Sequence, residues 1–376
     1  MTIRRKRLKK KPIIVLILII LTIIFVAGFN STSSQLLRLN YSKNAIKVIK
    51  KNNIEDEVLN NKYSKTLEVA LTSKEFDKNN LDIYLNVKYN NNKNITKQIN
   101  SLESLGYDKN EVGKIYEKLD DEEIDFLINY TYIDNLKSYL DYEIFKVENL
   151  DRYINYKNKE ENAELSYKDI ILNVNMDLDK EFYDNPKTIK NPDDLLVLVN
   201  KYNKLPDDYE AKDLEQIDSK FTVADMYLSK TAKNAFEEMC SDAKSINLVI
   251  KAVSTYRTKE YQQKLYNDYV KTRGLQYAEN YSARPRHSEH ETGLAVDVRG
   301  GLSAYTLFEN TEEYKWVKQN AHTYGFIIRY QEDKEDITGY NYESWHLRYV
   351  GKDVATYIYE HNITFDEYHA MFLDNN

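Results

Sequence analysis

The stretch SARPRHSEHETGLAVDVRG, residues 282–300, places a carboxylate inside an apolar run. His287 and His290 come shortly before this run, and Asp297 directly follows its residues L-A-V. A buried carboxylate is costly unless a cation, a hydrogen-bond network or a metal ion compensates its charge. Whatever fold the chain adopts must therefore bring such a partner to Asp297.

The apolar run predicts a strand, on which the side chain of Asp297 points away from the face of its apolar neighbours. Gly293 permits a sharp turn between His290 and that strand, so the imidazole and the carboxylate can converge. His346 lies in a second expected strand, within YESWHLRYV. Two imidazoles and one carboxylate, with water in the fourth place, form an open zinc site of catalytic type. Glu343, three residues before His346, is near enough to take a proton from the bound water.

Spacing alone leaves a second interpretation open. Asp297 could instead form an ion pair with Arg299 or Arg348, and the histidines could be ordinary polar residues. The patterns H-x6-D and E-x-x-H are each weak signals, and they do not separate a metal site from an ion pair.

Four motifs in order between residues 253 and 351 carry a resemblance to a known family. SEHETGLAVD matches the S-x-H-x-x-G-x-A-x-D signature of the zinc D,D-carboxypeptidase family that includes VanY, and YESWH matches its E-x-W-H. VSTYRTKEYQ is similar to the family's S-x-Y-R-x-x-x-x-Q element, and YGFIIRYQEDKEDITGYNYESWHLRYVG resembles its final core stretch. The resemblance covers about residues 193–370.

The resemblance implies an α+β fold for residues 193–376, a compact zinc D,D-peptidase-like domain in which helices surround a small antiparallel sheet. Interleaved helical and strand patterns from residue 193 onward agree with this fold class. The family's cofactor is Zn2+, and its ligands, carried over at matching positions, are His290, Asp297 and His346.

The resemblance also implies roles for residues around the metal. Glu343 matches the general base that acts on metal-bound water, and Arg257 matches the residue that stabilises the oxyanion. Ser288, Gln262 and Ser254 match positions that hold the terminal carboxylate and the backbone of the substrate. Capping of a strand end by Ser254 and solvation of a helix surface by Gln262 are the alternatives.

The implied reaction is removal of the C-terminal D-alanine from peptidoglycan stem peptides that end in D-Ala-D-Ala. Two other activities are open: an L,D-carboxypeptidase that acts on tetrapeptides, and a peptidoglycan endopeptidase that cleaves L-Ala-D-Glu. A non-enzymatic alternative is a metal-stabilised cell-wall-binding protein. Glu343 and Arg257 count against it, because a structural zinc site needs neither a base nor an open position.

Three residues depart from the family pattern. Arg286 stands where the family usually has Gly, Glu291 where Gln is common, and Ser344 where Pro usually precedes Trp. None of these removes an implied ligand or the base. Arg286 could contact an anionic peptide end or offset nearby acidic residues. We expect His287 to face solvent and His322 to pack at a helix end.

The N-terminus predicts a membrane anchor. Residues 1–11 carry seven Lys or Arg, and residues 12–29 carry no charge. At about 1.5 Å per residue this apolar stretch just crosses a bilayer core, so we expect a transmembrane signal-anchor, with a cleaved signal peptide as the alternative. The positive-inside rule places the basic tip in the cytoplasm and the C-terminal domain outside, on a single-pass protein of a bacterial cell membrane. Cys240, the only cysteine, cannot form an intramolecular disulfide and is expected as a small hydrophobe on a helix.

Residues 30–192 contain an internal duplication. LNYSKNAIKVIKKN at position 39 matches LGYDKNEVGKIYEK at position 105, and FDKNNLDIYLNVKYN at 76 matches FKVENLDRYINYKN at 145. These matches predict two repeats of short helices, at about residues 39–90 and 105–158, that serve either as a spacer or as a binding module.

The charge distribution bears on partners. The formal net charge is −7 although seven of the 53 basic residues lie in the first eleven positions, so the rest of the chain is more acidic still. An acidic chain argues against nucleic acid as a partner. The expected partners are peptidoglycan stem peptides and, through the N-terminal helix, the membrane; no protein partner is evident.

Overall fold

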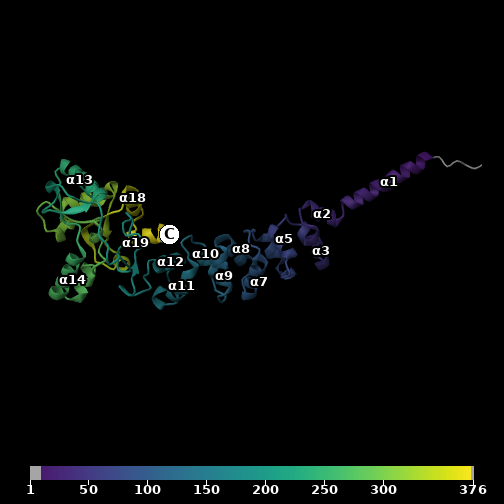
Figure 1. Cartoon of the computed structure of the whole chain (residues 1–376), viewed down its shortest axis with the longest axis horizontal. Coiled ribbons are helices and arrows are strands. Elements are labelled where there is room, and N and C mark those ends of the chain that lie inside the picture. Colours follow the sequence, from purple (N-terminus) through teal and green to yellow (C-terminus); the bar gives the residue numbers. More distant parts are fainter. Residues whose placement is uncertain (1–9, 374–376) are drawn as a thin grey trace, which may run out of the picture. The chain divides into compact units, whose positions relative to one another are not determined.

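The structure, a computed structural model, describes residues 10–373 (Figure 1). Most of the predicted basic tip, residues 1–11, therefore lies outside the described residues. The chain divides into two compact units, Met1–Leu150 and Asp151–Asn376. The domain borders expected from the sequence, at 29/30 and 192/193, remain predictions.

Helix α1, Lys10–Phe29, contains the uncharged stretch near the N-terminus. Within residues 10–373 no helix combines the length and the apolar character that a membrane crossing requires. The predicted transmembrane signal-anchor at 12–29 is therefore wrong, and so are the single-pass membrane localisation and the membrane as a partner.

The first unit continues with short helices that follow the chain in order (Figure 1). They are α2 Thr32–Arg38, α3 Lys43–Asn52, α4 Glu55–Leu59, α5 Lys65–Thr72, α6 Leu81–Asn86, α7 Ile95–Leu105, α8 Lys109–Lys118, α9 Asp121–Ile128 and α10 Leu136–Leu140. Their packing partners are near neighbours in the sequence, as in α3 with α5 and α7 with α9.

Matching positions of the two duplicated segments make the same contacts. The Tyr41 hydroxyl accepts a hydrogen bond from the backbone N–H of Ser64 at 3.3 Å, and the Tyr107 hydroxyl accepts one from Ile133 at 3.2 Å. A buried backbone N–H needs a hydrogen-bond acceptor. In each copy of the duplication, the tyrosine hydroxyl provides that acceptor for a residue more than 20 positions later in the same copy.

The second unit is a mixture of helices and small sheets. Its helices are α11 Leu150–Lys157, α12 Tyr167–Asn175, α13 Lys230–Ser245, α14 Lys259–Arg273, α15 Leu275–Tyr281, α16 Glu312–Asn320, α17 Glu335–Thr338, α18 Lys352–His361 and α19 Phe365–Phe372. A four-stranded antiparallel sheet has the order β5-β6-β8-β7, formed by Ile250–Ser254, Ala295–Gly300, Glu343–Tyr349 and Phe326–Tyr330. Two small sheets pair β1 Lys187–Thr188 with β2 Asn203–Lys204 and β3 Leu214–Gln216 with β4 Tyr227–Ser229. The α+β class with a small antiparallel sheet is confirmed.

The four-stranded sheet has one apolar face and one polar face, as the alternation of apolar and polar residues along its strands predicts. Val296 and Leu347 on its central strands belong to the same buried cluster as Phe236 and Met239 of α13. Cys240 is buried in this cluster as a free thiol, which confirms it as a small hydrophobe on a helix. With one face of the sheet committed to this core, the polar residues of the central strands project from the other face.

Gly293 closes the turn between the motif histidines and β6. Its φ is +72°, in the left-handed region that residues with a Cβ avoid. A Cβ built here would lie 2.7 Å from Leu214 Cδ2 and 3.2 Å from the backbone nitrogen of Ser229. Both the backbone conformation and the space therefore require glycine.

We expect Gly293→Ala to lower the free energy of unfolding of the second unit by roughly 2–4 kcal/mol, from left-handed strain and overpacking together. Both tryptophans, Trp316 and Trp345, lie in this unit, so their fluorescence during urea unfolding measures it. Gly113→Ala is the control, because a Cβ there meets nothing within 4 Å and it lies in α8 of the other unit. Equal tryptophan transitions for Gly293→Ala and the wild type would contradict this account.

Candidate active site

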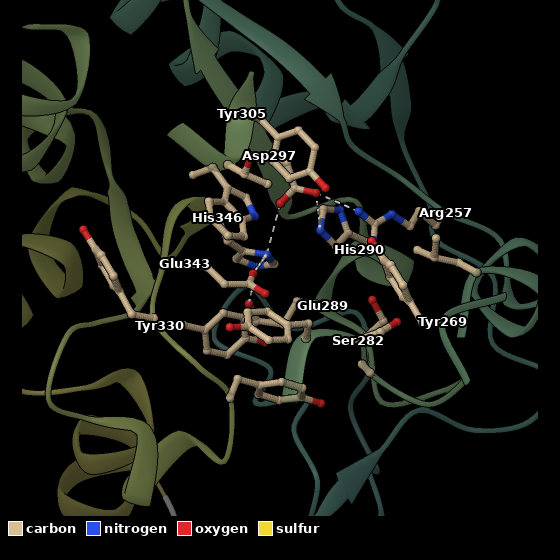
Figure 2. Close-up of a pocket in the computed structure, with 18 of the residues that line it drawn as sticks. Arg257, Tyr269, Ser282, Glu289, His290, Asp297, Tyr305, Tyr330, Glu343 and His346 are labelled. Carbon is tan, nitrogen blue, oxygen red and sulfur yellow. Dashed lines mark hydrogen bonds and ion pairs between the residues drawn. The ribbon is translucent and has the colours of Figure 1, made fainter. Parts of the chain in front are cut away.

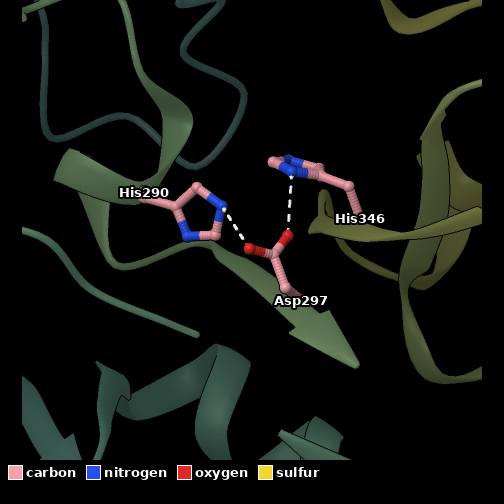
Figure 3. Close-up of side chains that lie close together, drawn as sticks. All are labelled: His290, Asp297 and His346. Atoms are coloured by element: carbon pink, nitrogen blue, oxygen red, sulfur yellow. Dashed lines mark ion pairs between the residues drawn. The ribbon is translucent and has the colours of Figure 1, made fainter. Parts of the chain in front are cut away.

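Three side chains converge at one point in the second unit (Figure 3). His290 comes from a short 3-10 helix, Glu289–Thr292, while Asp297 and His346 are register partners on β6 and β8. His290 Nε2 lies 3.4 Å from Asp297 Oδ2, and His346 Nδ1 lies 3.3 Å from Asp297 Oδ1. One possible ligand atom from each residue lies within 4.8 Å of the other two, and all three residues are buried.

Each imidazole is held by its outer nitrogen. His290 Nδ1 lies 2.8 Å from the carbonyl oxygen of Thr255, and since a carbonyl only accepts, this nitrogen carries the proton. His346 Nε2 lies 3.3 Å from Glu289 Oε2 and is the donor to that carboxylate. The inner nitrogens, which face Asp297, are then the ones available to a metal ion.

The centre has the character of a cation site. Asp297 Oδ1 is buried and accepts no hydrogen bond from any residue in the described part of the chain. It faces the lone pair of His346 Nδ1, so two acceptors oppose each other unless a proton or a metal ion lies between them. Two imidazole nitrogens and one carboxylate oxygen, with room for water, are the donor set of catalytic zinc sites, so the residues fit this ion.

The titration of the three groups agrees with this description. Burial and the neighbouring Arg257 lower the pKa of His290 to about 4, which keeps its imidazole neutral. Burial opposes protonation of His346, yet the adjacent carboxylates of Asp297 and Glu289 raise its pKa to about 9, so a proton occupies Nδ1 when no metal ion is bound. The pKa of Asp297 is held well below its usual value despite burial, by the adjacent imidazoles of His290 and His346 and by the Arg257 guanidinium. The site therefore attracts positive charge.

Arg257 is the ion-pair partner of Asp297, in place of the Arg299 or Arg348 considered from the sequence. Its Nη2 donates to Asp297 Oδ2 at 2.7 Å, and this leaves the other carboxylate oxygen for a cation. Ser254 Oγ accepts from Nε and Nη2 of the guanidinium at 2.9 and 2.7 Å, and Gln262 Oε1 lies 3.4 Å from Nη1.

The three residues that the sequence suggested for substrate binding thus separate into two groups. Ser288 lines the cavity beside the metal ligands. Ser254 and Gln262 instead hydrogen-bond to the Arg257 guanidinium, and Gln262 also donates to the carbonyl of Ala283 at 2.7 Å. A guanidinium fixed on two sides loses little freedom when it meets a charged ligand.

Glu343 begins β8 and is buried beside the ligands. Its Oε2 lies 3.6 Å from His346 Nδ1, which is too far for a hydrogen bond but close enough to share the same cavity. Burial raises the pKa of Glu343 to about 8. A divalent cation at the adjacent ligands lowers the pKa of such a carboxyl group and favours its charged form.

The cavity around these residues has a volume of about 380 Å³ (Figure 2), within the range of small-ligand sites. Its wall is aromatic, and the residues that supply it are Tyr269, Tyr277, Tyr281, Tyr305, Tyr330, Tyr340, Tyr342 and Trp345. These tyrosines were not predicted as site residues, because the chain contains 33 tyrosines and nothing in the sequence separates those of the cavity from the rest. Glu289 was not predicted either, since its only signal is its place in SEHE beside His290.

Comparison with known proteins agrees with this geometry. The family model for VanY, D-alanyl-D-alanine carboxypeptidase, matches residues 225–352. YodJ of Bacillus subtilis is 40% identical over 219 residues, which cover 56% of this chain and 78% of YodJ. The bifunctional D-Ala-D-Ala dipeptidase and D-Ala-D-Ala carboxypeptidase VanXYC of Enterococcus gallinarum is 35% identical, with 46% of this chain and 93% of that protein covered. The chain belongs to the VanY-like D-alanyl-D-alanine carboxypeptidase family.

Members of this family are zinc metallopeptidases, and the chain is an enzyme of this class with a donor set suited to Zn2+. Solved structures are also similar over part of the chain. The LdcB LD-carboxypeptidase is 41% identical with a TM-score of 0.47, over 51% of this chain and 92% of that one. A vancomycin-resistance D,D-pentapeptidase VanY, solved with Zn(II), is 33% identical with a TM-score of 0.41, over 46% and 97%.

Two of the departures from the family pattern are bonded to each other. Arg286 has a φ of +70°, the left-handed conformation that suits the glycine usual in the family. Its backbone N–H donates to Glu291 Oε1 at 2.6 Å, and its Nη1 lies 3.2 Å from Glu291 Oε2. Arg286 therefore offsets a local acid; it does not line the cavity, where it would meet an anionic peptide end.

The remaining histidine expectations have different outcomes. His287 is buried, with Nδ1 2.8 Å from the carbonyl oxygen of Asn200 and its ring edge-on to Tyr183, so the expectation that it faces solvent is wrong. His322 stacks on Tyr359 at a ring distance of 3.9 Å at the end of a 3-10 helix, which confirms helix-end packing.

We expect Glu291→Gln to lower the free energy of unfolding by about 1–2 kcal/mol, because the Arg286 guanidinium loses its carboxylate partner but keeps the carbonyl oxygens of Tyr209 and Asp207. Combining it with Arg286→Gly restores the residues common in the family and should recover most of that loss, since glycine also suits the positive φ. Urea unfolding of the wild type, both single variants and the double variant measures the coupling. Additive effects, within about 0.5 kcal/mol, would show that the two departures are independent.

Proposed function

We propose that the protein is a zinc-dependent carboxypeptidase that removes the C-terminal D-alanine of peptidoglycan stem peptides ending in D-Ala-D-Ala. The zinc ligands in this proposal are His290, Asp297 and His346. The observation that supports it best is the convergence of two imidazoles on the Asp297 carboxylate, whose Oδ1 accepts no hydrogen bond among the described residues. Such a cluster, beside a buried glutamate and a fixed arginine, has the parts of a hydrolytic site.

Bound zinc supplies a Lewis acid that polarises a carbonyl and makes a water molecule more acidic. Glu343 takes the proton of the attacking water as the water oxygen bonds to the carbonyl carbon. It then passes that proton to the amide nitrogen as the carbon–nitrogen bond breaks, so the products are free D-alanine and a peptide one residue shorter. Its position 3.6 Å from His346 Nδ1 keeps it beside the ligands without occupying a ligand position.

Arg257 stabilises the negative charge that develops on the carbonyl oxygen during attack. Its guanidinium is already oriented by Ser254 and Asp297 at 2.7 Å each, so little reorganisation is needed as the charge appears. Ser288, which lines the cavity, is proposed to bind the terminal carboxylate or the backbone of the peptide. Ser254 and Gln262 contribute by holding Arg257.

The substrate is tested with defined peptides. The purified, zinc-loaded chain is incubated with a pentapeptide ending in D-Ala-D-Ala, with the corresponding tetrapeptide and with isolated sacculi, and the products are identified by mass spectrometry. Loss of one D-alanine from the pentapeptide supports the proposal. Preference for the tetrapeptide identifies an L,D-carboxypeptidase, cleavage between L-Ala and D-Glu an endopeptidase, and sacculus binding without hydrolysis a wall-binding protein.

We expect Glu343→Gln to lower kcat/KM by roughly 10²–10⁴-fold, because the amide cannot accept the proton of the attacking water. The variant should still bind one zinc ion per chain, since Glu343 is not a proposed ligand. Glu332→Gln makes the same chemical change at an exposed position outside the cavity lining and should keep wild-type activity. Rates are followed by D-alanine release and zinc by metal analysis; full activity of Glu343→Gln would disprove the assigned mechanism.

A further inference from the structure

Behind the metal ligands lies a buried carboxylate that the proposed reaction does not use. Glu289 is 1% exposed. Its Oε1 accepts hydrogen bonds from Arg329 Nε at 2.7 Å and from Arg348 Nη1 at 2.9 Å. Its Oε2 lies 3.3 Å from His346 Nε2 (Figure 2). The two arginines use one oxygen, so the other is directed at the imidazole.

The network continues to the C-terminal helix α19. Arg329 Nη1 donates to Asp366 Oδ2 at 2.6 Å, and its Nη2 lies 3.3 Å from Asp366 Oδ1. Asp366 Oδ1 also accepts from Asn200 Nδ2 at 2.9 Å. Neither Asn200 nor Asp366 belongs to the stretch 225–352 that the family model matches.

The charges of this network balance, which allows it to be buried. Arg329 and Arg348 face Glu289 and Asp366, and each of these four charged residues is at most 3% exposed. Arg348 Nη2 also donates to the carbonyl oxygens of Leu195 and Val197, at 3.0 and 2.8 Å. An imidazole that donates to a carboxylate fixed in this way cannot rotate or exchange its tautomer without breaking a buried charged hydrogen bond.

We propose that Glu289 is a positioning residue of the metal centre: it holds His346 in the tautomer and orientation that present Nδ1 to the ion, and the Arg329–Asp366 pair makes this hold depend on helix α19. The inference rests on the proposed ligand set. A carboxylate behind a metal-bound imidazole also increases the basicity of that ligand, and loss of such a partner typically weakens metal binding by about 10–100-fold.

Zinc affinity of the full chain, measured by competition with a chromophoric chelator, tests the inference. We expect Glu289→Gln to raise the zinc Kd roughly 10–100-fold and to shift the visible absorption bands of the Co2+-loaded protein, because the geometry of His346 changes. Asp366→Asn should raise the Kd by a smaller factor. Glu367→Gln is the matched control: Glu367 caps the same helix at Thr364 and contacts Lys334, and it makes no contact with Arg329, so zinc affinity should stay at the wild-type value.

The outcomes separate this inference from the proposed function. Zinc binding that is equally tight in the wild type and in His346→Ala would overturn the ligand set itself. Wild-type affinity and an unchanged Co2+ spectrum in folded Glu289→Gln would overturn the positioning role alone. If Glu289→Gln does not fold, the two variants in α19 are compared instead. Weaker zinc binding by Asp366→Asn than by Glu367→Gln supports the positioning role, and equal zinc affinities of the two variants refute it.

Discussion

The burial of Asp297 is the constraint on which the rest of the second unit depends. The strand that carries it has its apolar residues in the core cluster, so the carboxylate must project from the opposite face, where water does not solvate it. Arg257 compensates one oxygen at 2.7 Å. The other faces Nδ1 of His346, its register partner on β8. Antiparallel register fixes which side chains are neighbours. A cation bound at this point would therefore link β6, β8 and the turn that supplies His290.

Around this centre the charges alternate in sign with distance. Asp297 and the two imidazoles are surrounded by Arg257 on one side and by Glu289 on the other, and Glu289 is in turn enclosed by Arg329 and Arg348. A buried charge is tolerated when each member has a partner of opposite sign and its remaining hydrogen-bonding groups are satisfied. The backbone carbonyls that accept from Arg348 meet this second condition. His290, Asp297 and His346 are thus each held by a buried partner in this network.

Much of the site followed from the sequence, because it depends on local geometry. The two-residue period of a strand and the turn at Gly293 are sufficient to bring His290 and Asp297 together, and the α+β class with a small sheet follows from short alternating elements. Partners that are distant in the sequence could not be predicted in this way. Nothing local indicates that Asp297 pairs with Arg257, 40 positions away, in preference to the nearer Arg299. The burial of His287 likewise depends on Asn200, 87 positions away. At the N-terminus, the uncharged run predicts a membrane span, but no helix within residues 10–373 meets the requirements of one.

The pair formed by Arg286 and Glu291 shows how the motif can vary without disturbing its candidate metal ligands. His290 lies between the two residues of the pair, and Asp297 follows them. A left-handed φ costs an arginine about 1–2 kcal/mol relative to glycine, and the buried Glu291 carboxylate requires compensation that a glutamine does not. Each departure alone is therefore unfavourable, yet together the guanidinium neutralises the carboxylate, and the carboxylate accepts the backbone N–H of the strained residue. Because this exchange takes place outside the cavity lining, it changes the support of the loop and leaves the tyrosine wall, Ser288 and Arg257 in place.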